Sequence, residues 1–228
     1  NNKFGVPLSL FNLNQKDDFG VFEVGMDQKG EIDTLTKIIK PDVGVITNIS
    51  YAHAKNFKNL KQIALAKSEI MNNIVSGGSI ILNADDMFYK FHQKMALRKK
   101  LKVYSFSINK KNATVRLNSI KKEKTKFKAI ISINNQKKHF FISSNFENNL
   151  KNLLAAITVI SIFKDIKTLN KNIFYNYQIP YGRGDISKIT INKKKIFLID
   201  ESYNSNPLSL KSSINNFDLI DSKNNKKH

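Results

Sequence analysis

Apolar residues in the first half of the chain form short continuous runs that alternate with stretches of helical spacing. The runs are typical of buried strands and cover residues 19–24, 43–49, 79–83 and 102–106. The stretches between them predict helices over residues 31–39, 60–74 and 85–95. Because continuous apolar strands that alternate with helices are covered on both faces, the pattern indicates an α/β fold with a mostly parallel sheet.

The pattern changes in the second half of the chain. Short alternating runs between residues 113 and 142 predict an added antiparallel β segment, arranged as a meander. Two helices, a hairpin and a last helix are then expected over residues 149–163, 166–174, 186–200 and 208–219. The loop at 179–184, which is rich in Pro and Gly, places a domain boundary near 180–200.

Composition excludes several classes of protein. The 228 residues are 41% hydrophobic, which is enough to bury a core, and they include no cysteine. Disulfide scaffolds, thiolate zinc sites, iron–sulfur clusters and cysteine nucleophiles are therefore excluded. No apolar run reaches the roughly 18–20 residues of a membrane span, so none is expected, and no secretory leader is recognisable. The chain opens without methionine and ends on a polar tail, which indicates a fragment.

The formal charge of +20 comes from 38 Lys and Arg residues against 18 Asp and Glu residues. Such an excess is typical of proteins that bind nucleic acid or an anionic membrane surface. Arginine is preferred for bidentate recognition of bases and phosphates, yet only three of the basic residues are arginine: Arg98, Arg116 and Arg183. The lysines are scattered in small groups, which favours a solvated surface over a binding stripe. A basic nucleic-acid-binding module stays open as the alternative from another class.

Several polar side chains follow the predicted strands, at the sheet edge where parallel α/β proteins bind ligands. They are Glu23 after the first strand, Asn48 and His53 after the second, and Asn83, Asp85 and Asp86 after the third. Lys67 lies in the helix predicted over 60–74, and we expect its stem to be partly buried among apolar neighbours. Together, Glu23 and His53 predict a hard-cation site with oxygen ligands, closer to magnesium than to zinc.

Each of these residues also has a simpler structural interpretation. Glu23 could be a helix N-cap or a solvated loop carboxylate, and Asp85 could cap the helix that follows it. A lysine in an apolar helix usually extends its ammonium group to water, which applies to Lys67. His92 and His139 are expected to be ordinary surface histidines, so a single histidine is weak evidence for a metal site.

The segment over residues 200–207 reads Asp-Glu-Ser-Tyr-Asn-Ser-Asn-Pro and follows an apolar strand directly. Two carboxylates, two amides and hydroxyl groups crowd this strand-to-helix loop, and such loops bind ribose hydroxyls and phosphates well. An Asx-rich turn with an N-cap would account for Asn206 but not for the whole run.

Eight motifs occur in the order found in the Mur ligases, and the chain resembles that family over nearly its whole length. They are NNKFGVPLSL, FEVGMDQKGEI, TNISYAHAKNF, AKSEI, LNADD, NNLKNLLAA, PYGRG and IDESYNSNP. The last is the most diagnostic, and it resembles the branch that adds D-alanyl-D-alanine to UDP-N-acetylmuramoyl-tripeptide. The resemblance implies a central ATPase domain with a P-loop-type sheet over 1–182 and the start of a Rossmann-like C-terminal domain over 183–228.

The resemblance also implies roles for individual residues. Glu23 is similar to the carboxylate that holds magnesium against the nucleotide phosphates, and His53 is similar to a ligand of a second magnesium. Lys67 matches the lysine that carbon dioxide carbamylates in this family. A carbamate turns a cation into an oxygen ligand, and it forms from a neutral amine, which partial burial favours. The implied ATP-binding residues are Asn149, Asn152, Arg183, Glu201, Asn204 and Asn206, and the implied substrate-binding residues are Asn1 and Asn2.

The implied reaction is amide formation in the cytoplasm by a monomer that uses ATP and Mg²⁺. ATP phosphorylates the terminal carboxylate of the UDP-linked tripeptide, and the amine of D-alanyl-D-alanine then displaces phosphate from the acyl phosphate. The alternative within this class is another Mur-type or folylpolyglutamate-type amino acid ligase.

Two features depart from the family pattern. No Gly-Lys-Thr or Gly-Lys-Ser phosphate-binding loop occurs in the chain. The family's Gly-x-His-Asn before the adenine-side helix is replaced by Phe-Glu-Asn-Asn at 146–149. We therefore expect negligible ligase turnover from this chain alone, and ADP release that depends on D-alanyl-D-alanine would contradict that expectation.

Overall fold

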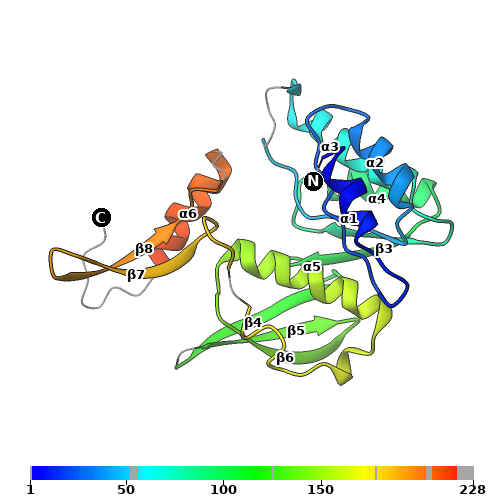
Figure 1. Ribbon diagram of the computed structural model, residues 1–228. Coiled ribbons are helices and arrows are strands. Elements are labelled where there is room, and N and C mark those ends of the chain that lie inside the picture. Colours follow the sequence, from blue (N-terminus) through cyan, green and yellow to red (C-terminus); the bar gives the residue numbers. More distant parts are fainter. Residues whose placement is uncertain (1, 52–55, 125, 178, 204–206, 220–228) are drawn as a thin grey trace.

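A six-stranded mixed sheet forms the centre of the computed structural model, which describes residues 2–51, 56–124, 126–177, 179–203 and 207–219. Its strands follow one another in chain order: β1 (Val43–Ile46), β2 (Ser79–Asn83), β3 (Lys102–Ser107), β4 (Val115–Glu123), β5 (Lys126–Ile133) and β6 (Gln136–Ile142). The pairings from β1 to β4 are parallel, and the pairings from β4 to β6 are antiparallel (Figure 1).

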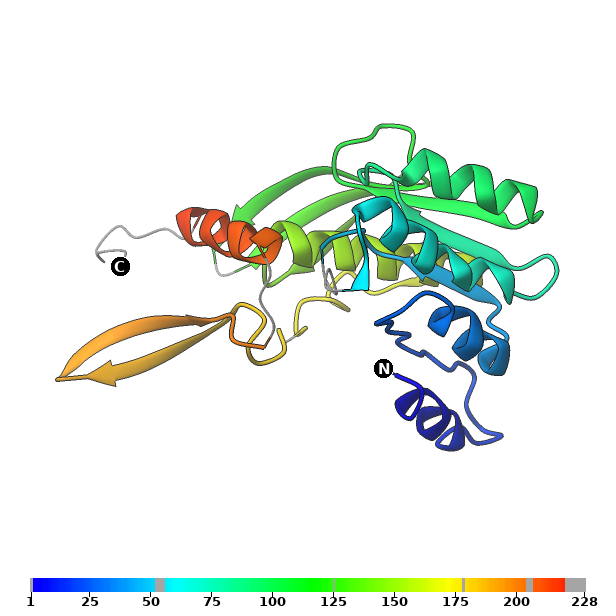
Figure 2. The ribbon, with the colours of Figure 1, turned by 90° about the horizontal axis from the view of Figure 1, so that it is seen from above.

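Helices cover both faces of this sheet (Figures 1 and 2). The α-helices are α1 (Gly5–Phe11), α2 (Glu31–Ile39), α3 (Leu60–Ser68), α4 (Tyr89–Arg98), α5 (Glu147–Phe163) and α6 (Pro207–Leu219). Two short 3-10 helices are η2 (Glu69–Asn72) and η3 (Ile166–Thr168). Helices α2, α3 and α4 pack on one face and α5 packs on the other.

Strand β2 shows how the sequence divides the core into two clusters. Successive side chains of a strand point to opposite faces of the sheet. Ile80 and Leu82 therefore join the cluster under α3 and α4, whereas Ile81 joins the cluster under α5. Every residue of β2 is buried, as expected for a central strand that is covered on both faces.

A separate two-stranded sheet follows the central sheet along the chain. Strands β7 (Asp185–Ile191) and β8 (Lys194–Asp200) pair antiparallel around a turn at Asn192 and Lys193, whose φ angles of 50° and 63° suit a tight hairpin. Figure 1 shows this hairpin to one side of the central sheet. Helix α6 connects back to α5, because Asn148 Nδ2 donates to Ser212 Oγ at 3.1 Å.

The structure confirms the α/β fold class, the parallel strands, the meander and the hairpin, and it corrects four predicted elements. Residues 19–24 are not a strand, because a strand needs a partner for its backbone and the described sheet ends at β1. The helix predicted over 60–74 ends earlier than expected, at Ser68, and the helix predicted over 85–95 begins later than expected, at Tyr89. The helix predicted over 166–174 is limited to η3.

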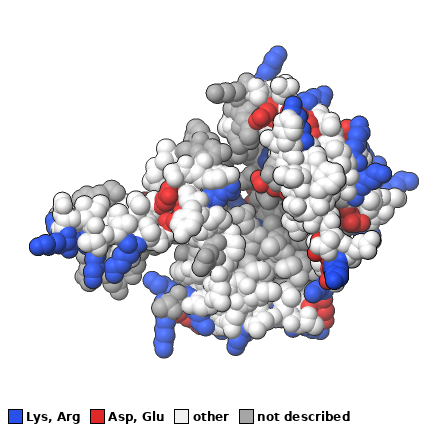
Figure 3. All heavy atoms as spheres, in the orientation of Figure 1, with Lys and Arg blue, Asp and Glu red and all other residues white. Residues whose placement is uncertain are grey.

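Basic side chains are spread over the surface. On the face shown in Figure 3, the Lys and Arg residues lie around the margin and along the hairpin rather than in one stripe, and acidic residues lie among them. This distribution is typical of a solvated surface. Across the described ranges, the structure contains no helix long and apolar enough to cross a membrane.

Candidate active site

Lys67 projects from the last turn of α3 toward the loop that follows β1. Its neighbours Ala66 and Ser68 are buried, and Lys67 itself is half-buried, as expected from the sequence. The Nζ atom donates a hydrogen bond to the carbonyl oxygen of Asn48 at 3.3 Å. Burial lowers the pKa of Lys67 below its ordinary value, and the nearby carboxylate of Asp86 partly opposes that effect. Lys67 therefore loses its proton to give the neutral amine more readily than an exposed lysine does.

His92 lies in α4, close enough to Lys67 for the two charges to interact. A surface position is predicted for it from the sequence, but the side chain is only 2% exposed, so that prediction is wrong. Its Nε2 atom lies 3.0 Å from the carbonyl oxygen of Ala64 in α3, which requires the proton on Nε2 and joins the two helices. Burial and the charge of Lys67 lower the pKa of His92, and the Ala64 hydrogen bond and the Asp86 charge oppose them.

This lowered pKa predicts that acid destabilises the fold through His92. The unfolded chain holds a proton on this side chain more readily than the folded chain does. The stabilisation that neutral His92 gives to the folded state is therefore fully present above about pH 6.5 and is lost as pH falls below that value. His92→Gln keeps a donor for Ala64 but does not titrate. Urea unfolding between pH 7.5 and 5 should therefore show a smaller loss of stability in the variant. Parallel profiles for the two proteins would contradict this role.

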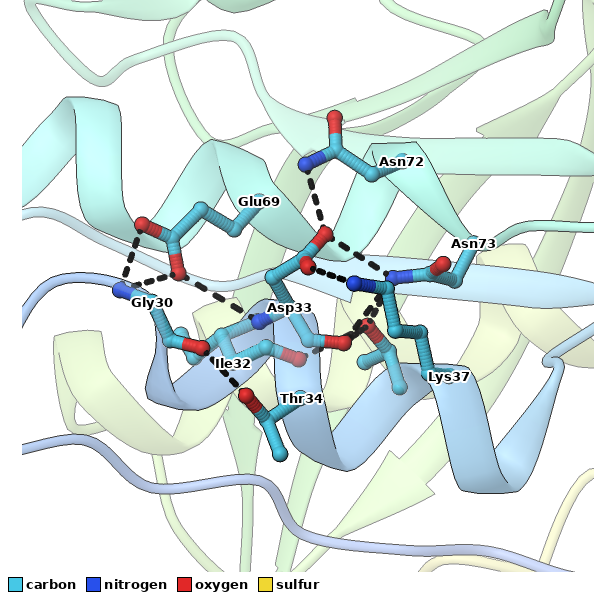
Figure 4. A network of polar contacts seen from close by, with 9 residues as sticks. Gly30, Ile32, Asp33, Thr34, Lys37, Glu69, Asn72 and Asn73 are labelled. Atoms are coloured by element: carbon cyan, nitrogen blue, oxygen red, sulfur yellow. Dashed lines mark hydrogen bonds and ion pairs between the residues drawn. The ribbon is translucent and has the colours of Figure 1, made fainter.

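Glu69, also in the AKSEI motif, has a structural role that the sequence did not reveal. Its two carboxylate oxygens accept the N–H of Gly30 at 2.8 and 3.0 Å, and Oε2 accepts the N–H of Asp33 at 3.3 Å (Figure 4). Glu69 thereby satisfies donors at the start of α2, where a negative charge also suits the helix dipole. Asp33 in turn accepts from Asn72, which ties α2 to η2, and it pairs with Lys37 of its own helix.

Replacing Glu69 by alanine should lower the free energy of unfolding by about 1–3 kcal/mol, because the N–H of Gly30 loses its charged acceptor. The matched control is Glu147→Ala, which removes an exposed carboxylate paired with Lys151 and should cost no more than about 1 kcal/mol. Urea titration measures both variants. Equal losses in the two would show that the α2 cap contributes no more than a surface ion pair.

Asp85, in the turn after β2, has a different role from the helix N-cap that the sequence predicts. Asp85 does not cap α4; it accepts from Ser107 Oγ and from the backbone N–H of Ile108, both at 2.7 Å. Its carboxylate therefore ties the end of β2 to the end of β3. The helix begins only at Tyr89, so five residues of turn lie between strand and helix.

Of the two residues predicted to hold a cation, the structure describes Glu23 but not His53. Glu23 lies exposed in a segment without regular secondary structure before α2 and not at the end of a sheet strand, because residues 19–24 do not pair with the sheet. His53 lies outside the described residues, as do Asn1, Asn204 and Asn206. The expected convergence of Glu23 and His53 at one sheet edge therefore stays a prediction.

A second cluster joins the PYGRG loop to the segment after β8. The backbone N–H of Tyr203 donates to Gly182 O at 3.0 Å, and that of Gly184 donates to Asp200 O at 2.7 Å. The guanidinium group of Arg183 stacks on the ring of Tyr203 at 4.1 Å from its centroid. The loop motif and the acidic motif, about 20 residues apart in sequence, thus form one surface.

Glycine is required in this loop. Gly182 has a φ of 72°, and a Cβ atom there would lie 2.9 Å from the backbone nitrogen of Tyr203. A Cβ atom at Gly184 would lie 3.0 Å from Oε1 of Glu201, whose side chain is half-buried. The close approach of the two segments places Glu201 beside the loop that carries Arg183.

The remaining candidates lie at helix starts. Asn149 Nδ2 donates to Ser144 Oγ at 2.9 Å, and Asn152 is exposed one turn further along α5. Asn2 Oδ1 accepts the N–H groups of Phe4 and Gly5 at 3.0 and 3.1 Å, so it stabilises the start of α1. The contact between α5 and α6 described above brings the start of α5 near the helix that follows residues 200–206.

The described side chains do not fit a magnesium ion in their present form. Among the residues that the structure describes, no three or more His, Asp or Glu side chains are grouped as a metal site would require. Magnesium prefers oxygen ligands, and Lys67 presents an amine. Only a chemical change that adds oxygens to Lys67 would make it a ligand.

Comparisons with known proteins agree with this geometry. The Mur ligase middle domain matches residues 1–160. The UDP-N-acetylmuramoyl-tripeptide–D-alanyl-D-alanine ligase of Buchnera aphidicola subsp. Baizongia pistaciae is 32% identical over 211 residues, which cover 92% of this chain and 44% of that protein. The chain therefore spans about half the length of such curated relatives.

Solved structures show the same fold. MurF from Acinetobacter baumannii aligns with a TM-score of 0.84 and 26% identity, covering 97% of this chain and 47% of that one. MurF from Thermotoga maritima in complex with ADP aligns with a TM-score of 0.78 and 21% identity, covering 95% of this chain and 48% of that one, and this similarity concerns the fold alone. Since the family's middle domain covers more than half of its residues, the chain belongs to the Mur ligase family.

Proposed function

We propose that this chain supplies the central part of a cytoplasmic ligase that uses ATP and Mg²⁺ to add D-alanyl-D-alanine to UDP-N-acetylmuramoyl-tripeptide. The observation that carries the proposal is Lys67, a half-buried lysine with a lowered pKa, held against the loop after β1 in a Mur ligase middle domain. The curated relative from Buchnera aphidicola has this activity in its name.

Carbon dioxide is the reagent that would give Lys67 its role. The neutral amine attacks CO₂, a C–N bond forms, and one proton leaves, so that the side chain ends in a carbamate with two oxygens. Such a group could hold magnesium, which the amine cannot. Burial favours this step because it lowers the pKa of the amine.

The cluster around Arg183 supports a nucleotide site. Arg183 is a cation on the molecular surface, next to the half-buried carboxylate of Glu201, and these groups suit a phosphate and a ribose hydroxyl respectively. ADP is bound in the related MurF structure from Thermotoga maritima. We assign ATP to this cluster with Asn149 and Asn152, and we assign residues 1–182 and 183–228 to the central domain and the start of the C-terminal domain.

The test is a coupled assay of ADP release by the intact gene product that contains this chain. Release should require both the UDP-linked tripeptide and D-alanyl-D-alanine. Diaminopimelate, lysine or glutamate as the amine should give no more than background release. ADP release with one of those amines in place of D-alanyl-D-alanine would assign the protein to another branch of the family.

A further inference from the structure

The loop after β1 is held at three consecutive residues by side chains that lie elsewhere in the chain. The contacts are Asn83 Nδ2 to Thr47 O at 3.1 Å, Lys67 Nζ to Asn48 O at 3.3 Å, and Ile49 N to Asp86 Oδ2 at 2.8 Å. Asn83 is the last residue of β2, Asp86 lies in the turn that follows, and Lys67 belongs to α3. The position of the Asn48 carbonyl, and so of the amine, depends on its two neighbours.

Asp86 is the charged member of this set, and both of its oxygens are engaged. Oδ2 accepts from Ile49, while Oδ1 accepts the backbone N–H of Phe88 at 2.8 Å. The backbone of Asp86 is itself fixed, since its N–H donates to Asn83 O at 3.2 Å. Hydrogen bonds to a carboxylate are short and strong, so this side chain is a rigid link between the loop and the turn.

We propose that Asp86 is a positioning residue for Lys67. By holding the N–H of Ile49, it fixes the peptide unit that presents the Asn48 carbonyl, and that carbonyl orients Nζ. Its negative charge also acts on the lysine and favours the ammonium form of the side chain. The importance of this orientation for catalysis rests on the proposed function of Lys67, whereas the link between loop and amine does not.

The neighbouring carboxylate provides a matched control. Asp85 lies in the same turn and is also half-buried, but it accepts from Ser107 and Ile108 on the side of β3. Removing Asp85 should loosen residues 107–109 and leave residues 47–50 in place. A difference between the two variants therefore separates the link to Lys67 from a general contribution of the turn.

Hydrogen exchange of the 228-residue chain tests the link to the loop. In Asp86→Ala, the amide of Ile49 should exchange about 10-fold faster or more, because it loses its acceptor. Asp86→Leu keeps a side chain of similar length but has no acceptor oxygen, and it serves if the alanine variant does not fold. Asp85→Ala should instead accelerate exchange at 107–109. Unchanged exchange at Ile49 in a folded Asp86 variant, or equal acceleration there in Asp85→Ala, overturns the proposal.

Chemical labelling tests the link to the amine. A brief pulse of an acylating reagent, followed by mass spectrometry, gives the labelling of Lys67 relative to exposed Lys61 on the same helix. Asp86→Ala should raise that ratio several-fold because Nζ is released from Asn48, and Asp85→Ala should leave it unchanged. Faster exchange at Ile49 without a change in Lys67 labelling also overturns the proposal, because Asp86 would then hold only the loop.

The proposed function can fail separately. If Lys67→Met leaves ligation by the intact gene product unchanged, then Lys67 is not the catalytic lysine. The exchange and labelling results would still show whether Asp86 positions it, since neither measurement depends on turnover.

Discussion

Replacing Lys67 by methionine in the intact gene product should lower kcat for ligation by about 10²–10³-fold, with a much smaller change in KM for ATP. Methionine keeps the apolar stem, so α3 still packs. It removes the amine that donates to Asn48 and that would carry the carbamate oxygens. The coupled assay of ADP release at saturating substrates measures the change.

Two further variants show which property of Lys67 matters. Lys61→Met makes the same substitution at an exposed position of α3 and should keep full activity. Lys67→Arg keeps a cation that can donate to Asn48 but cannot form a carbamate, so it should be as inactive as Lys67→Met. Full activity in Lys67→Arg would show that a positive charge is sufficient there. With ¹³C-bicarbonate, a carbamate signal should appear in the wild type and be missing from both Lys67 variants.

The strands of the sheet could be predicted because a buried strand consists mostly of apolar residues, and such runs are visible in the sequence. Residues 79–83 form β2 as expected, and the meander between 113 and 142 contains β4, β5 and β6. Segment 19–24 has the same apolar character yet pairs with no described strand, and Val21 is 94% exposed. Apolarity shows that a segment can be buried in a sheet, but the presence of a partner strand is a property of the whole fold.

The support of the candidate site could not be predicted because its partners are distant in sequence. Glu69 and Gly30 are 39 residues apart, and Asp86 and Ile49 are 37 apart. His92 meets Ala64 across 28 residues. Motif spacing indicated Lys67 and its partial burial, but which carboxylate faces the loop and which faces β3 depends on how α3, α4 and the turn pack.

Phe140 is one of the largest fully buried side chains among the described residues, so its loss should strongly destabilise the fold. It lies in β6, is completely buried in the cluster under α5, and pairs with Ala129 of β5. Its ring meets that of Phe174 edge to face, with 5.4 Å between centroids. Phe174 lies in the segment that follows η3, so the contact between the two rings joins the meander to that segment.

Phe140→Ala should therefore lower the free energy of unfolding by about 3–5 kcal/mol, since the lost side chain leaves a cavity that the packed residues around it cannot fill. For a chain of this size, that loss corresponds to a fall in Tm of about 6–20 °C. Phe11→Ala is the matched control, because Phe11 is 87% exposed and its loss removes little buried surface. Thermal and urea unfolding measure both variants. Equal effects at the two positions would mean that the meander is not packed against α5 as a single core.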